Sequence, residues 1–102
     1  MREYELYLPL HYNDGRSIEF DKLTAIKRRL VNEFGGLTHF PQENEGFWKV
    51  GSFTFRDRIV ILRVLAVDRA RADQFFRQLK GDLKKDWMQN DVLIIAREVS
   101  AV

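Results

Sequence analysis

Side chains that can bind a small molecule gather in the middle of the chain and again near its end. The candidate ligand-binding residues are His39, Trp48, Arg56, Asp57, Arg58 and Gln89, with Thr38 beside them. An imidazole can act as a general base near neutral pH, and an arginine can hold a carboxylate or phosphate through two parallel hydrogen bonds. These residue types predict a ligand site, although their spacing alone favours a structural interpretation, in which Trp48 stacks on Phe55 across two strands and the other side chains are solvated.

A hairpin must position most of these residues, because Gly51-Ser52 lies between two stretches with the composition of strands. A two-residue Gly-X loop is typical of a type II′ turn, so Val50 is expected to pair with Phe53. The same register places Trp48 opposite Phe55. Aromatic side chains on a projecting hairpin can also hold a neighbouring subunit, which would make this arm part of an interface.

The hairpin is long enough to fix the middle of the fold. Continued outward, its register pairs Leu37 with Ala66, and a bulge is expected near Pro41 or Gly46. The second arm, residues 53–66, is apolar on both of its faces. One face carries Val60, Leu62, Val64 and Ala66, and the other carries Ile59, Ile61 and Leu65 together with Arg63.

Two amphipathic helices are predicted from apolar residues that recur at helical spacing. The first spans Glu19 to Phe34, with Ser17 or Asp21 as its N-cap and Gly35-Gly36 at its end. The second follows an N-cap at Asp68. Its apolar stripe consists of Ala72, Phe75 or Phe76, Leu79, Leu83 and Trp87.

Strands at the two ends of the chain complete the pattern. Residues 4–10 alternate between apolar and polar side chains, as a half-buried strand does, and residues 91–99 are apolar on both faces. The resulting order, β-α-β-β-α-β, predicts a single ferredoxin-like α+β domain over residues 1–102, an antiparallel sheet with two helices on one face.

Helices that cover one face of a sheet leave the other face open. The expected open-face residues are Tyr7, Ile59, Ile61, Arg63 and Leu65. Because contiguous exposed apolar surface usually marks an interface, we expect a homodimer to form there. Glu5, Arg63 and Arg97 fall on the same face of neighbouring strands, so they can form a charge cluster inside that interface or a solvated surface network.

Composition restricts the chemistry. The chain has no cysteine, which excludes disulfides, thiolate nucleophiles and thiolate metal sites. With 17 basic and 15 acidic residues, the small positive excess gives little support for a nucleic-acid partner. The N-terminus is charged and no long apolar run follows, so we expect a cytoplasmic protein with no membrane partner.

Short motifs resemble those of a family of small bacterial proteins of uncharacterised function. The matching segments are Phe34-Gly35-Gly36-Leu37-Thr38, Gly46-Phe47-Trp48, Arg58 to Val64 and Trp87-Met88-Gln89-Asn90-Asp91-Val92-Leu93. The family carries Phe-x-Gly-Leu-Thr, Gly-x-Trp and late aromatic-x-Gln-x-x-Val segments in the same order. The family tends to carry an acid after Gly-x-Trp, for which Asp57 is the nearest candidate here. The resemblance supports the fold and implies no reaction.

Several site types find little support. His11 and His39 are the only imidazoles and lie far apart, so no metal or cofactor is expected. Asp14 follows the first strand, as does a metal-binding aspartate in ferredoxin-like CRISPR-associated nucleases, but Asn13-Asp14-Gly15 is also good turn chemistry. The aliphatic run from Arg58 to Val64 lacks the rings on which RNA-recognition motifs stack bases.

The sequence therefore leaves the function unknown and whether the protein is an enzyme undecided. A homodimer-forming interaction or small-ligand-binding domain is the leading hypothesis. The alternatives are a dimeric α+β barrel enzyme, with a pocket between two sheets lined by Tyr7, Trp48 or His39, and a basic nucleic-acid-binding or nuclease-like protein of similar topology.

Overall fold

The predicted order of strands and helices is confirmed by a computed structural model that describes all 102 residues. The elements are β1 (Arg2–Pro9), α1 (Phe20–Phe34), β2 (Thr38–Val50), β3 (Phe53–Ala66), α2 (Arg69–Asp86) and β4 (Leu93–Glu98). Neither helix is long and apolar enough to cross a membrane.

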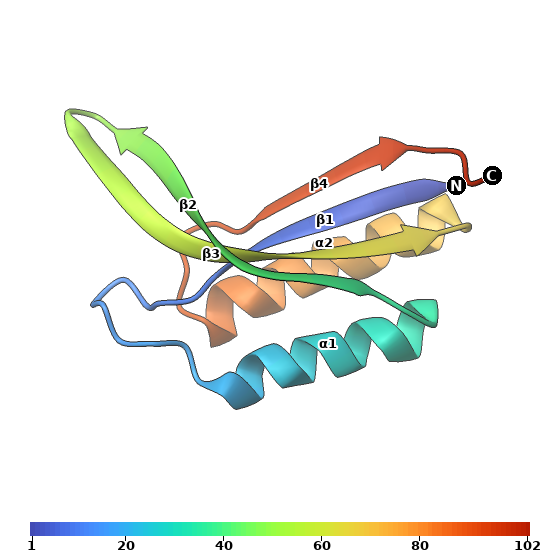
Figure 1. Cartoon of the computed structure of the whole chain (residues 1–102), viewed down its shortest axis with the longest axis horizontal. Coiled ribbons are helices and arrows are strands. Elements are labelled where there is room, and N and C mark those ends of the chain that lie inside the picture. The colour runs from blue at the N-terminus through green and yellow to red at the C-terminus, as the bar shows by residue number, and fades with distance from the viewer.

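The four strands form one antiparallel sheet in the order β2-β3-β1-β4. Both helices lie on the same side of this sheet, and the two chain ends lie next to each other (Figure 1). This is the ferredoxin-like α+β arrangement that the sequence predicts. The sheet therefore has one face covered by helices and one face without any covering element.

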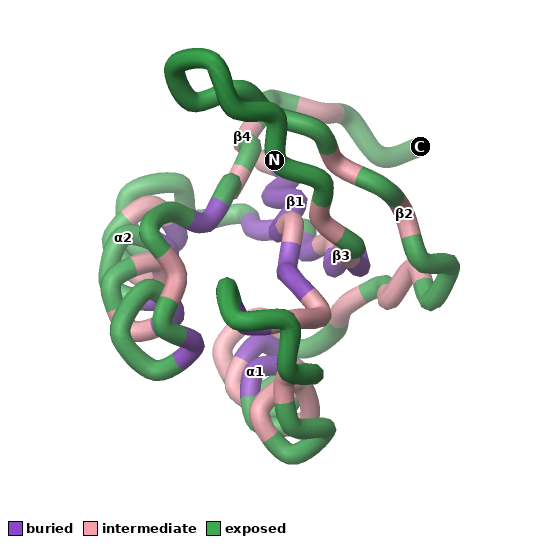
Figure 2. The backbone as a smooth tube through the Cα atoms, turned by 90° about the vertical axis from the view of Figure 1, so that its left-hand side faces the viewer, coloured by how far each residue is buried: buried purple, intermediate pink, exposed green.

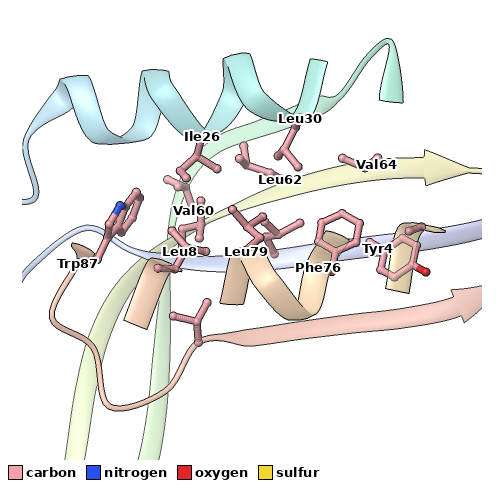
Figure 3. Close-up of a cluster of buried hydrophobic side chains, with 14 of the residues drawn as sticks. Tyr4, Leu8, Ile26, Leu30, Val60, Leu62, Val64, Phe76, Leu79 and Trp87 are labelled. Carbon is pink, nitrogen blue, oxygen red and sulfur yellow. The ribbon is translucent and has the colours of Figure 1, made fainter. Parts of the chain in front are cut away.

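The core lies between the sheet and the helices (Figure 3). Alternate residues of β1 and β3 point into it, and the helices contribute residues three and four apart, because those positions share one face of a helix. The buried strand residues include Tyr4, Leu6, Leu8, Val60, Leu62 and Val64, and the buried helix residues include Ile26, Leu30, Ala72, Phe76, Leu79 and Leu83. Of the two candidates in the second helix, Phe76 is the buried ring, and it stacks on Tyr4 with ring centroids 4.3 Å apart.

The turn of the hairpin is the one predicted. Val50 pairs with Phe53, and Gly51 has φ +61° while Ser52 keeps a negative φ, as a type II′ turn requires. The distal half of the hairpin extends past the helices (Figure 1) and is exposed along both strands (Figure 2). The hairpin is thus an arm that projects from the domain.

The register of the hairpin near the helices differs from the prediction. A bulge between Phe40 and Asn44, at one of the two predicted places, shifts the pairing so that Thr38 lies opposite Arg63. The expected pairing of Leu37 with Ala66 is therefore wrong, because the pairing of β2 with β3 ends at Thr38 and Arg63. A bulge adds residues to one strand only, so every pair beyond it moves.

Two of the three predicted helix ends are confirmed. The Asp68 side chain accepts a hydrogen bond from Arg71 N, and Gly35 ends α1 with φ +83°. Trp87, expected at the end of the second helix's stripe, is buried as the residue just after α2. The prediction of Ser17 or Asp21 as the first N-cap is wrong: Glu19 holds that position without a side-chain capping bond, because its carboxylate binds the Tyr12 hydroxyl.

Candidate functional site

The uncovered face of the sheet, called the open face here, carries all five residues of the expected interface. Register pairs place Tyr7 beside Ile61 and Arg63 beside Glu5, with Ile59 and Leu65 on the same side of β3. Strand β4 adds Leu93 and Ile95, which pair with Tyr7 and Glu5. Leu65, Leu93 and Ile95 are exposed large apolar side chains, so the open face is apolar and uncovered.

A charge network crosses the open face near the chain ends. Glu3 and Glu5 are only 7% and 8% exposed, and they are held by Arg63 and Arg97. Arg97 Nε lies 2.8 Å from Glu3 Oε2, and its Nη2 lies 2.6 Å from Glu5 Oε1. The expected cluster of Glu5, Arg63 and Arg97 therefore exists, with Glu3 as a fourth member that balances its charge.

The environment of Glu5 favours its ionised form. Burial works against ionisation, but the hydroxyl of Tyr7, which donates a hydrogen bond of 2.9 Å, and the charge of Arg97 together lower the pKa of Glu5. Two carboxylates and two guanidinium groups leave no net charge in the network. Such a patch can be covered by another surface without burying an unpaired charge.

The projecting arm of the hairpin carries exposed rings. Trp48 lies directly opposite Phe55 as predicted. The exposed apolar residues of the arm are Phe47, Trp48, Val50, Phe53 and Phe55. Trp48 is 48% exposed, whereas Trp87, the other tryptophan, is 2% exposed in the core. Trp48 is therefore the tryptophan available to a ligand or partner.

The base of the arm brings together residues from three parts of the chain. Leu10 N donates to Arg58 O at 2.9 Å, one step beyond the last register pair of β1 and β3, which keeps His11 beside Asp57. Gln89, from the connection between α2 and β4, donates from Nε2 to the carbonyl oxygens of His11 and Trp87 at 3.5 and 2.9 Å. Asp57 and Gln89 therefore flank His11.

Asp57 is half-buried and makes no hydrogen bond or ion pair. Burial raises the pKa of Asp57, and the neighbouring His11 offsets part of that effect by favouring the carboxylate. Gly46 faces Asp57 across the strands, and a Cβ placed on Gly46 would lie 3.8 Å from Cζ3 of Trp48. The Trp48 ring thus extends along the arm toward Asp57.

The other predicted ligand-binding residues lie elsewhere. Arg56 and Arg58 point to the opposite side of the arm, where they form exposed ion pairs with Glu45 (2.6 Å) and Glu43 (3.4 Å). His39 pairs with Leu62 and so shares the helix-covered face. Burial, assisted by the charge of Lys27, lowers the pKa of His39, and its Nε2 is buried without a partner. The structure therefore places Trp48 and Asp57 on one face of the arm, brings Gln89 to the neighbouring His11, and leaves the other three outside.

His11 lies beside the candidate site, although the sequence suggested it only as a weak metal ligand. A signal was present, since extending the antiparallel pairing of β1 and β3 by one pair places His11 opposite Asp57. Asp14, the other metal candidate, is held by Arg16 at 2.7 Å. No group of three or more histidine, aspartate or glutamate side chains is arranged to hold a metal ion.

Comparison with known proteins gives a likeness in fold. The sequence matches no protein-family profile and no curated protein. A phage SAM lyase in complex with S-methyl-5′-thioadenosine superposes with a TM-score of 0.72 at 11% identity, covering 95% of this chain and 80% of that one. The same type of enzyme in its apo state gives 0.71 at 12% identity, with 95% and 79% covered. At this low identity, the likeness is one of fold alone.

Proposed function

We propose that this protein is a homodimer-forming domain that binds a small organic ligand. The observation that carries the proposal is the open face, a broad apolar sheet surface that no helix of the chain covers. Apolar surface of this kind is unusual on a soluble monomer and common at interfaces. The neutral charge network adds to this, because a second copy can cover it without isolating a charge.

A closed two-fold assembly is the arrangement that we favour. In such a dimer the same patch is used on both copies, so Tyr7, Ile59, Ile61 and Leu65 would meet their counterparts or each other. Arg63 would lie among them, still held by its two glutamates. The open face would then be buried on both copies, while the hairpin arm remains free to contact a ligand or the partner's edge.

The ligand half of the proposal rests on the base of the arm. Trp48 offers an exposed ring, and Asp57 and His11 offer ionisable groups beside it. A protein with a similar fold was solved with S-methyl-5′-thioadenosine bound. A purine nucleoside bears one flat ring system and several hydroxyl groups, which suit stacking on tryptophan and hydrogen bonding to a carboxylate.

Native mass spectrometry tests both halves together. We expect a dimer for the purified protein, and a further increase in mass when S-methyl-5′-thioadenosine is added. Ile61→Asp should convert the dimer to a monomer, because a carboxylate would be buried at the centre of the interface.

A matched variant controls for the introduction of a charge. Val31 is also a partly exposed apolar residue, but it lies on α1, away from the open face. Val31→Asp should leave the dimer intact. A wild-type monomer, or a dimer that persists in Ile61→Asp, would contradict the proposed interface.

An enzyme is the second candidate, and a specific observation favours it. Burial raises the pKa of Asp57 next to an imidazole, which is the kind of pair that exchanges protons during catalysis. Incubation with S-adenosylmethionine, followed by chromatography for released S-methyl-5′-thioadenosine, tests this role. Release that disappears in Asp57→Asn would favour an enzyme, and no release above that of buffer would leave the binding function.

A further inference from the structure

Asp57 differs from the other half-buried aspartates and glutamates in having no partner. The rest are paired with arginine or tyrosine: Glu33 with Arg71, Asp73 with Arg2 and Tyr4, and Asp82 with Arg29. An ionised carboxylate that is partly removed from water needs a cation or hydrogen-bond donors to offset its lost hydration. The chain supplies such a group at every comparable position except this one.

None of the residues next to Asp57 supplies such a group. Gly46, which has no side chain, pairs with Asp57 across the strands. The ring of Trp48 lies next to Gly46. On the other side is His11, whose imidazole makes no hydrogen bond, and behind it the Gln89 amide is fixed by the two carbonyl oxygens to which it donates. A carboxylate is thus set beside an exposed indole at the base of the arm.

An indole and a carboxylate together are selective for one class of ligand. The face of tryptophan attracts cations through its ring quadrupole, most usefully those whose charge is surrounded by methyl or methylene groups. The carboxylate attracts the same charge by Coulomb's law, more strongly because water is partly excluded. A metal ion fits less well, since a single carboxylate and an indole do not form a coordination shell.

The geometry points to a binding site for an organic cation, a sulfonium or quaternary ammonium group, held between the Trp48 ring and the Asp57 carboxylate. This inference deepens the ligand-binding half of the proposed function, on which it rests. Asp57 contributes the charge and Trp48 the apolar contact. His11 and Gln89 border the site and can orient the uncharged part of the ligand.

Isothermal titration calorimetry with two matched compounds tests the inference. S-adenosylmethionine carries a sulfonium, and S-adenosylhomocysteine has the same skeleton without that methyl group and its charge. We expect the wild-type protein to bind the sulfonium compound at least tenfold more tightly. Asp57→Asn should remove most of this preference, and Trp48→Leu should weaken binding of the sulfonium compound several-fold.

Glu45→Gln is the control, because Glu45 is an exposed carboxylate on the same arm that is already paired with Arg56. It should keep the tenfold preference. Circular dichroism on each variant checks that the fold is retained.

The outcomes separate this inference from the proposed function. Equal affinity for the two compounds, or a preference that survives Asp57→Asn, would overturn the cation site while leaving a small-ligand function. Failure of both compounds to bind at millimolar concentration, with the dimer intact by native mass spectrometry, would overturn the cation site and leave only the assembly.

Discussion

The open face and the base of the arm treat carboxylates in opposite ways. Near the chain ends, Glu3 and Glu5 are almost fully buried and each contacts both Arg63 and Arg97. At the base of the arm, Asp57 is half-buried and has no cation of its own. The pKa of Glu5 is lowered because hydrogen bonds and arginine charges compensate its carboxylate. The pKa of Asp57 is raised because burial acts on a carboxylate that has no such partner.

The difference indicates which charges serve the fold and which are left for another molecule. A compensated network stabilises the sheet or fills an interface, and its partners come from the same chain. An uncompensated carboxylate costs stability in the absence of a ligand, as groups at binding sites commonly do. Breaking the first region should therefore damage the protein, and breaking the second should strengthen it while weakening binding.

The largest expected effect comes from removing one arginine of the network. Arg63→Met leaves Glu3 and Glu5 with a single cation, and it also removes the contact in which the Arg63 guanidinium lies 4.8 Å from the centre of the Phe40 ring. We expect a loss of about 2 kcal/mol in the free energy of unfolding, less than for a fully buried pair because Arg63 is partly exposed. Urea denaturation followed by circular dichroism measures it.

Arg56→Met is the matched control for that prediction. Its ion pair with Glu45, at 2.6 Å, is nearly as short as the 2.5 Å pair of Arg63 with Glu3, but both side chains are about half exposed on the arm. Exposed pairs contribute little, so we expect a change within about 0.5 kcal/mol. Equal losses in the two variants would show that burial does not distinguish these arginines.

A smaller effect on stability is expected when Glu5 is replaced, and this effect should depend on pH. Its pKa in the folded protein is lower than the ordinary value of 4.5, so its contribution to stability is present above that pH and is lost as the pH falls through the folded pKa. The wild-type protein should therefore exceed Glu5→Gln in stability at pH 7, and the two should converge toward pH 3. Thermal unfolding of both proteins across this range measures the difference, and a gap that widens in acid would contradict it.

Much of the fold could be predicted because local signals agreed with the final structure. The Gly51-Ser52 turn fixed the hairpin near its tip, and the helical spacing of apolar residues gave both helices. The register beyond Phe40 could not be predicted, since the size of a bulge depends on how the strands pack on α1 and β1 rather than on local sequence. The first helix cap was missed because helix spacing does not show that the hydroxyl of Tyr12, in the loop before the helix, binds the Glu19 side chain.

The part of the candidate site that lies on one hairpin could be predicted from local sequence, and the part from another strand could not. Trp48 and Asp57 lie on one hairpin, so their spacing alone places them on one face. His11 comes from the end of β1, and its position follows only when the pairing of β1 with β3 is known. His39 was included because it belongs to the same ribbon, but it alternates with Thr38 and Phe40 and therefore points to the face opposite Trp48, toward the helices.

The smallest expected effect is on Asp57 itself, and its sign is opposite to that of Glu5. The pKa of Asp57 is raised above its ordinary value of 3.8, so the stability associated with its neutral form is present below that pH and is lost as the pH rises through the folded pKa. At pH 7 the ionised group destabilises the folded protein. Asp57→Asn should therefore raise the melting temperature at pH 7 by roughly 2 °C, a small gain because solvent screens a partly exposed group.

The same comparison at pH 3 makes the test specific. There the carboxyl is neutral in both the folded and unfolded states, so the wild type and Asp57→Asn should melt together. Differential scanning calorimetry at the two pH values measures both gaps. A variant that is less stable than the wild type at pH 7 would mean that Asp57 is stabilised by the chain itself, and the contrast between the open face and the base of the arm would then be lost.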